Sequence, residues 1–158
     1  LGANFSGIGT DYPALQDVIK HVITAGNTQT KAEDVGNVLY NRGLFNAVIV
    51  AEAIATAQKM TGKKAISGAD MRQGLENFKL DEARLNELGL GGFTGALSGS
   101  CSDHEGAGSV FIQQWDGNTF KKVSDLIAPM TDVVRPLLED AANKYVSDKP
   151  NWKGQTCG

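Results

Sequence analysis

Residues 35–78, VGNVLYNRGLFNAVIVAEAIATAQKMTGKKAISGADMRQGLENF, decide the fold of this chain. Between residues 42 and 60 only a thin polar stripe interrupts the apolar side chains, and it consists of Glu52, Thr56 and Lys59 at helical spacing. A helix that is apolar nearly all round is usually buried between other elements. The sequence therefore predicts a buried helix over residues 42–60, after a short extended segment, in a layered α/β body.

Cap residues divide the part of the chain that follows this helix. Gly62 is placed to end it as a C-cap. Ser67 and Asp70 form a capping box, with Asp in place of the usual Glu, and this box predicts a helix that runs through Phe78. A further short helix is expected over residues 81–88.

The two ends of the chain carry patterns of their own. Pro13 suits the first turn of a helix that Gly26 ends. The turn Asp116-Gly117-Asn118 lies between two β-prone runs and predicts a hairpin. A last helix is expected from Thr131, as N-cap, to about Val146, with an inner face made of Val134, Leu137, Leu138, Ala141 and Tyr145.

Length and charge limit the class of protein. The chain has 158 residues, which suits one domain or a large piece of one, and a formal net charge of −3 without a dense basic cluster. No nucleic-acid partner is predicted. The longest apolar stretch is interrupted by Glu52 and is shorter than a membrane span. The first residues have no signal-peptide pattern and resemble a core strand, so we expect the chain to begin inside a larger fold.

The motifs that could carry catalysis fail on their spacing. ATAQKMTGKK lacks the first glycine and the final hydroxyl of a phosphate loop, and the glycines of GLGGFTG have the wrong spacing for a dinucleotide fingerprint. Cys101 and His104 are adjacent in sequence, whereas catalytic triads assemble from separate segments, so His104 is expected to shape a turn. The two cysteines and two histidines have no zinc-site spacing. No catalytic residue, cofactor or metal is predicted, and the chain is not expected to be an enzyme.

Two long stretches resemble a known family. VLYNRGLFNAVIVAEAIATAQKMTGKKAISGADMRQGLENF and LGLGGFTGALSGSCSDHEGAGSVFIQQWDGNTFKKVSDLI resemble the C-terminal half of ABC-transporter substrate-binding proteins of the branched-chain amino-acid type. The resemblance covers residues 10–127, which is less than half of the family's length. The residues that carry it are Tyr40-Asn41-Arg42-Gly43, Thr61-Gly62-Lys63-Lys64, Asp103-His104-Glu105-Gly106 and Gln113-Gln114-Trp115-Asp116-Gly117.

The resemblance implies part of a two-lobe, type I periplasmic-binding-protein fold, α/β in class, whose lobes have three α/β/α layers. It implies four ranges, which are a hinge crossover strand, the second part of lobe one, the crossover and hairpin strands of lobe two, and a C-terminal helix with its tail. These ranges are residues 1–9, 10–97, 98–127 and 128–158.

The same resemblance implies a function outside the cytoplasm of a bacterium, in the periplasm or an equivalent compartment. The expected role is capture of a small ligand, an amino acid or an aromatic or organic acid, between two lobes, and its delivery to an inner-membrane ABC permease. The N-terminal half of the same protein is the further expected partner. A ligand-sensing domain of a receptor or regulator with the same fold is the alternative, and an enzyme with an α/β body is a weaker one.

The resemblance also proposes functional residues. Tyr40, Asn41 and Arg42 are expected at the edge of the ligand cleft, where Arg42 could bind a carboxylate. The structural alternatives are a core position for Tyr40, and for Arg42 a helix cap or an ion pair with Glu52 or Asp34.

An exported protein can keep a disulfide, so the resemblance also suggests a bond between Cys101 and Cys157. Closing a loop of that length would stabilise the fold by about 4 kcal/mol in the chain-entropy model. Two free thiols are the alternative.

Overall fold

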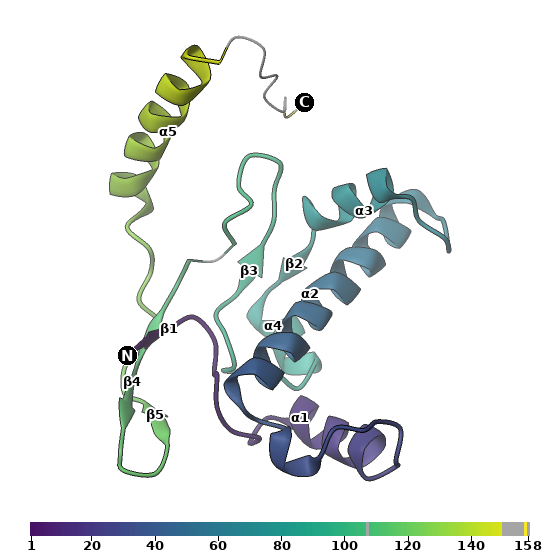
Figure 1. The fold of residues 1–158 in the computed structure, drawn as a ribbon. Coiled ribbons are helices and arrows are strands. Elements are labelled where there is room, and N and C mark those ends of the chain that lie inside the picture. Colours follow the sequence, from purple (N-terminus) through teal and green to yellow (C-terminus); the bar gives the residue numbers. More distant parts are fainter. Residues whose placement is uncertain (107, 150–156, 158) are drawn as a thin grey trace.

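The computed structural model describes residues 1–106, 108–149 and 157. Figure 1 shows a helix-rich body and, apart from it, a small sheet followed by a long helix. The body contains α1 (Pro13–Val18), the π-helix η1 (Ile19–Ile23), the 3-10 helix η2 (Ala32–Asp34), α2 (Val38–Thr61), α3 (Gly68–Leu75), β2 (Lys79–Leu80), α4 (Glu82–Glu87) and β3 (Leu97–Ser98). The second group contains β1 (Gly2–Ala3), β4 (Phe111–Trp115), β5 (Phe120–Lys122) and α5 (Thr131–Ser147).

α2 begins earlier than the sequence pattern predicts. The Asn37 side chain accepts hydrogen bonds from the backbone N–H groups of Leu39 and Tyr40, both at 2.9 Å, and so caps a helix that begins at Val38, four residues before Arg42. The segment expected to be extended is therefore the first turn of the helix. The C-terminal prediction is confirmed, because Gly62 ends α2 in the left-handed conformation with φ of 69°.

The predicted capping box opens α3. Ser67 Oγ accepts from the N–H of Asp70 at 3.2 Å, and the Asp70 carboxylate accepts from the N–H of Ser67 at 2.9 Å. Lys63 adds an ion pair to Asp70 at 2.9 Å. The hydrogen bond from the Ser67 backbone, helped by Lys63, lowers the pKa of Asp70 to about 2. The helix ends at Leu75 instead of Phe78.

α3 packs directly on α2 through small residues. Gly74 is buried, and a Cβ at this position would overlap the carbonyl oxygen of Ala53 and approach the Cβ of Ala57 to 3.0 Å. Ala53 and Ala57 are themselves buried on α2. The two helix backbones therefore approach each other closely only because all three positions lack a bulky side chain.

The core lies beside these helices. Its buried members are Phe78, Leu80, Leu85, Leu90 and Phe93. The Phe93 ring lies 5.8 Å from that of Phe5, 5.1 Å from that of Tyr12 and 5.7 Å from that of Phe45, measured between ring centroids. This cluster joins the N-terminal segment, the start of α1 and the first half of α2.

Two small antiparallel sheets complete the described part of the chain. β2 pairs with β3, so that Leu80 lies opposite Leu97. The second sheet has the order β1-β4-β5, and β4 and β5 form the predicted hairpin. Asp116 shapes the turn, since its Oδ1 accepts from the N–H groups of Asn118 at 2.9 Å and Thr119 at 2.8 Å.

The predicted three-layer α/β/α lobes are not found in the described residues. The strands there are two to five residues long and all pair antiparallel. α2 was expected to be buried nearly all round, yet Leu39, Val50, Ile54 and Met60 are exposed on it. The described residues cover only the side of α2 that faces α3 and the core, so the two-lobe fold class predicted from the sequence is corrected.

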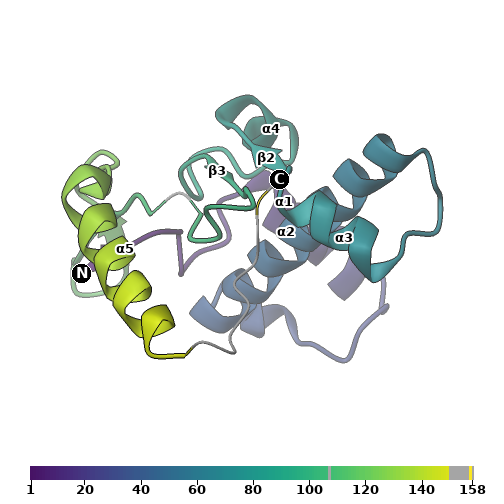
Figure 2. The same ribbon diagram turned by 90° about the horizontal axis from the view of Figure 1, so that it is seen from above.

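α5 also departs from the prediction. Met130, not Thr131, is its N-cap, and no side chain caps the helix. The expected inner face is exposed, with Leu137 66% accessible. In both views α5 lies apart from α2 and α3 (Figure 1, Figure 2). Nothing in the described part of the chain covers its apolar face.

The close approach of α3 to α2 predicts the effect of Gly74→Ala. The added methyl group must push the helices apart, so we expect a loss of about 1–3 kcal/mol in the free energy of unfolding. Gly68→Ala in the same helix is the matched control, because its Cβ would meet nothing within 4 Å. Urea denaturation of both variants checks this, and equal midpoints would contradict it.

The lowered pKa of Asp70 predicts a pH dependence of stability. Because the folded pKa of about 2 lies below the unfolded value of about 3.9, the stabilisation from ionised Asp70 is complete above about pH 4. It is lost as the pH falls through 2. The difference in denaturation midpoint between the natural chain and Asp70→Asn should therefore shrink between pH 4 and pH 2, and a constant difference would refute this.

Candidate functional site

The three residues predicted to contact a ligand lie in the first two turns of α2 and differ in their surroundings. Asn41 is fully buried, and its Nδ2 donates to the carbonyl oxygens of Ser6 at 3.3 Å and Gly9 at 3.1 Å. Within the described residues no donor reaches its Oδ1. Asn41 therefore fastens α2 to the N-terminal segment and does not face an open cavity.

Arg42 is the member of the three that lines a cavity. Its guanidinium lies over the Phe5 ring, 5.8 Å from the centroid, and forms no ion pair with a described carboxylate. The cavity has a volume of about 430 Å³ and is also lined by Phe45, Asn46 and Glu105. Tyr40 is half-buried and does not line it.

A larger cavity of about 670 Å³ opens between α3, β3 and the loop after β3. Its walls are mostly apolar, from Ile49, Met71, Leu75, Phe78 and Leu97. Its volume falls in the range of small-molecule sites.

Charged side chains lie at one edge of this larger cavity. The Glu76 carboxylate, almost buried, accepts from Arg72 Nε at 2.8 Å, and His104 Nε2 lies 3.6 Å from the same oxygen. Sequence reasoning assigned His104 only to a turn and did not single out Arg72 or Glu76. These residues come from α3 and from a loop almost 30 positions later, and no spacing in the sequence joins them.

Glu52, the polar residue in the middle of α2, is held by α4. Arg84 donates to both Glu52 oxygens, from Nη2 at 2.7 Å and from Nε at 3.0 Å, and to Glu87 at 2.9 Å. These bonds to Glu52, with a smaller effect of Glu87, raise the pKa of Arg84 above its usual value. The ion pair between Arg42 and Glu52 considered from the sequence is therefore wrong.

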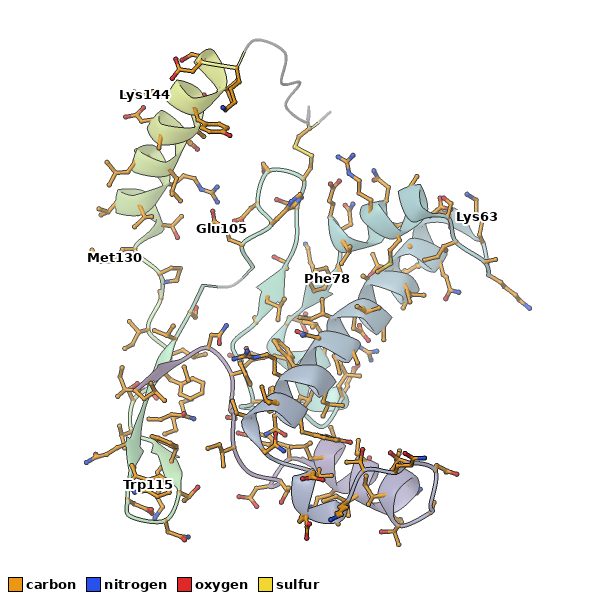
Figure 3. All side chains as sticks on the ribbon, in the orientation of Figure 1. Lys63, Phe78, Glu105, Trp115, Met130 and Lys144 are labelled. Carbon is orange, nitrogen blue, oxygen red and sulfur yellow. A yellow bond between two sulfur atoms is a disulfide. The ribbon has the colours of Figure 1, made fainter. Side chains whose placement is uncertain are left out.

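Residues 100–106, here called the bridging loop, connect the body to α5. Cys101 forms a disulfide with Cys157. Arg135 on α5 forms ion pairs with Asp103 at 3.1 Å and Glu105 at 3.8 Å. Figure 3 shows the disulfide as a yellow bond and Glu105 on the side of the loop toward α5.

The described side chains contain no group of three or more His, Cys, Asp or Glu residues that could hold a metal ion. By length and composition alone, α2 could cross a membrane. This differs from the sequence interpretation, in which Glu52 made the apolar stretch too short.

Comparisons with known proteins add one finding. No protein-family model matches the chain, and no curated protein matches it. A solved structure described as an "abc transporter permease from pseudomonas fluorescens group" is similar over 99% of this chain, with 33% sequence identity and a TM-score of 0.88. The chain spans 38% of the length of that solved chain. The words of that description place the solved chain in an ABC transporter.

The finer predictions are corrected by the same match. The solved chain is described as a permease, which contradicts the assignment to substrate-binding proteins of the branched-chain amino-acid type. The predicted role in capturing a ligand and handing it to a permease is therefore wrong. The predicted partners, which are a ligand, a permease and the N-terminal half, are also wrong. The alternative of a ligand-sensing domain is not supported either, because it assumed the same two-lobe fold. The motifs behind the resemblance are largely helix caps and turns, such as Gly62 and Asp116, which many unrelated folds use.

Contact of Tyr40, Asn41 and Arg42 with a ligand stays a prediction.

The buried position of Asn41 generates a separate prediction about the stability of the fold. Asn41→Ala should lower the free energy of unfolding by about 1–3 kcal/mol, because the carbonyl oxygens of Ser6 and Gly9 lose their donor. Asn46→Ala, exposed on the same helix, is the control and should change it by less than about 0.5 kcal/mol. Chemical denaturation measures both, and a neutral Asn41→Ala would show that these bonds contribute nothing.

Proposed function

We propose that this chain is part of a bacterial ABC transporter and that its described residues lie on the extracytoplasmic side of the membrane. The observation that carries the first part is the likeness to the solved permease-described chain, which extends over nearly the whole sequence. An identity of 33% over that length makes a shared role in transport the simplest interpretation.

The disulfide supports the location. Disulfides persist in the periplasm and other oxidising compartments, whereas cytosolic thiols are kept reduced. Cys101 and Cys157 are far apart in sequence and meet at the surface of the bridging loop. A cross-link of this kind suits a domain that folds outside the cytoplasm.

The surroundings of α2 favour a position outside the bilayer, although the helix is long enough to span it. Glu52 lies near its middle and is paired with Arg84, whose side chain is 41% exposed. An ion pair at the centre of the hydrocarbon layer would be costly. α3 also packs on α2, and Arg84 of α4 is paired with Glu52, so one side of the helix already contacts protein and we infer that its exposed apolar residues do so too.

The four ranges predicted from the sequence are kept as a proposal. Residues 10–97 contain all the buried members of the core, which are Phe78, Leu80, Leu85, Leu90 and Phe93, and this supports treating them as one unit. The pairing of β1 with β4 supports placing residues 1–9 beside residues 98–127. The last range, 128–158, includes α5 and Cys157; its residues 150–156 and 158 lie outside the described part.

The proposed location predicts the labelling of surface lysines in cells. A membrane-impermeant amine reagent applied to intact spheroplasts of the source bacterium should modify Lys31, whose side chain is 75% exposed, as fully as it does after lysis. Peptide mass spectrometry measures this, with a cytoplasmic protein as the negative control. Modification of Lys31 only after lysis would overturn the extracytoplasmic location.

Association with an ABC transporter needs its own test. The full-length protein, tagged at its chromosomal locus and cross-linked in living cells, should be isolated together with an ATP-binding cassette subunit or with a membrane subunit encoded beside one. An unrelated exported protein with the same tag serves as control. Recovery of such subunits at the control level would count against the transport role.

A further inference from the structure

The attachment of α5 to the rest of the molecule differs from that of the other α-helices in the described residues, each of which buries at least one residue. α5 buries no side chain and makes no extensive contact with another helix or strand. Every residue from Thr131 to Lys149 is exposed except Arg135, which is half-buried. The helix is therefore not held by a hydrophobic core of its own.

Within the described residues, three connections link α5 to the rest of the molecule. Before the helix, Val110 and Ile127 exchange two backbone hydrogen bonds, at 3.0 and 2.7 Å. Within the helix, Arg135 reaches Asp103 and Glu105. Beyond the helix, Cys157 is joined to Cys101. The last two connections both end on the bridging loop, so this loop carries most of the attachment.

The bridging loop is itself shaped and anchored. The N–H of Ser100 donates to the carbonyl oxygen of Asp103 at 2.9 Å, and Asp103 Oδ1 accepts from the N–H of Glu105 at 2.9 Å. These bonds hold both carboxylates toward Arg135. On the other side, His104 lies 3.6 Å from Glu76 of the body. The bridging loop therefore contacts the body on one side and α5 on the other.

The disulfide is the stronger of the two connections to the loop. Ion pairs between partly exposed side chains contribute little to stability, and those of Arg135 are of this kind. A cross-link between residues 56 positions apart removes much more freedom from the open chain. A single helix of 17 residues with Pro136 inside it is marginal without such support.

We propose that the bridging loop is a redox-dependent clamp that holds α5 when Cys101 and Cys157 are oxidised and releases it when they are reduced. Reduction by a dithiol transfers two electrons and two protons to the disulfide, which becomes two thiols, while the reductant closes to its own disulfide. The clamp rests on the proposed extracytoplasmic location, because there the oxidised form persists. The clamp closes only after export, so α5 and its apolar face are held in place only then. This face consists of Val133, Val134, Leu137, Leu138 and Tyr145.

Hydrogen exchange of the purified chain tests the clamp directly. Backbone amides of α5 should exchange about tenfold faster or more after reduction with dithiothreitol and alkylation of both thiols. Amides of α2, which the clamp does not touch, should keep their rates. Equal exchange of α5 in the two states would overturn the proposal. Loss of protection in α2 as well would also overturn it, because the disulfide would then support the whole fold.

Variants separate the two connections. Cys101→Ser combined with Cys157→Ser should reproduce the reduced state without alkylation. Arg135→Gln in the oxidised chain should raise α5 exchange by a smaller factor, about two- to fivefold. Lys144→Gln, an exposed change on the same helix, is the matched control and should leave it unchanged. No effect of the double serine variant would refute the clamp, whereas failure of lysine labelling in cells would refute only the location.

Discussion

The packing of three aromatic rings around Phe93 is the constraint on which the described body depends. Phe5 comes from the N-terminal segment, Tyr12 from the start of α1 and Phe45 from α2, so one cluster fixes three segments that are distant in sequence. The N–H of Ser6 donates to the carbonyl oxygen of Phe93 at 2.7 Å and adds a backbone link at the same place. Both cavities have walls on α2, so this cluster also positions them.

Outside the Phe93 cluster, helices pack through small side chains and closely spaced backbones, and not through large apolar side chains. α3 reaches α2 through Gly74, Ala53 and Ala57, and this brings Arg72 and Glu76 to the edge of the larger cavity. The β1-β4-β5 sheet buries Phe111 but leaves Ile112 and Trp115 exposed, and Val123, directly after β5, is exposed as well. Apolar burial is therefore uneven, with a compact body and a second group that relies on backbone pairing, ion pairs and one cross-link.

The sequence predicted the local features of the fold well. Gly62, the box of Ser67 and Asp70, and the turn at Asp116 each act through neighbours only a few residues away, so their chemistry can be read from spacing. The start of α2 was missed because Asn37 precedes residues with no helical stripe. The prediction of a layered architecture was wrong because the pattern of an apolar helix indicates that other elements cover it but does not identify those elements.

The candidate site was less predictable for a related reason. Arg42 was singled out from the sequence and does line a cavity, whereas Asn41 beside it is turned into the body by its bonds to Ser6 and Gly9. Two adjacent helical positions thus hold a structural side chain and an accessible one, and residue type alone cannot assign them. Arg72, Glu76 and His104 meet only through the packing of α3 against the loop, which no short pattern encodes.

The placement of α5 shows how a few specific contacts can determine the position of an element relative to distant parts of the chain. A TM-score this high over nearly the whole chain includes α5, so a related protein keeps a closely similar overall arrangement of helix, sheet and body. Yet α5 gains almost no burial from the described residues, and helix propensity cannot set its direction. Its position must therefore come from discrete connections, and Arg135 with the Cys101–Cys157 disulfide supplies two of them at one loop. In this part of the molecule specific pairs, not a hydrophobic core, determine the geometry.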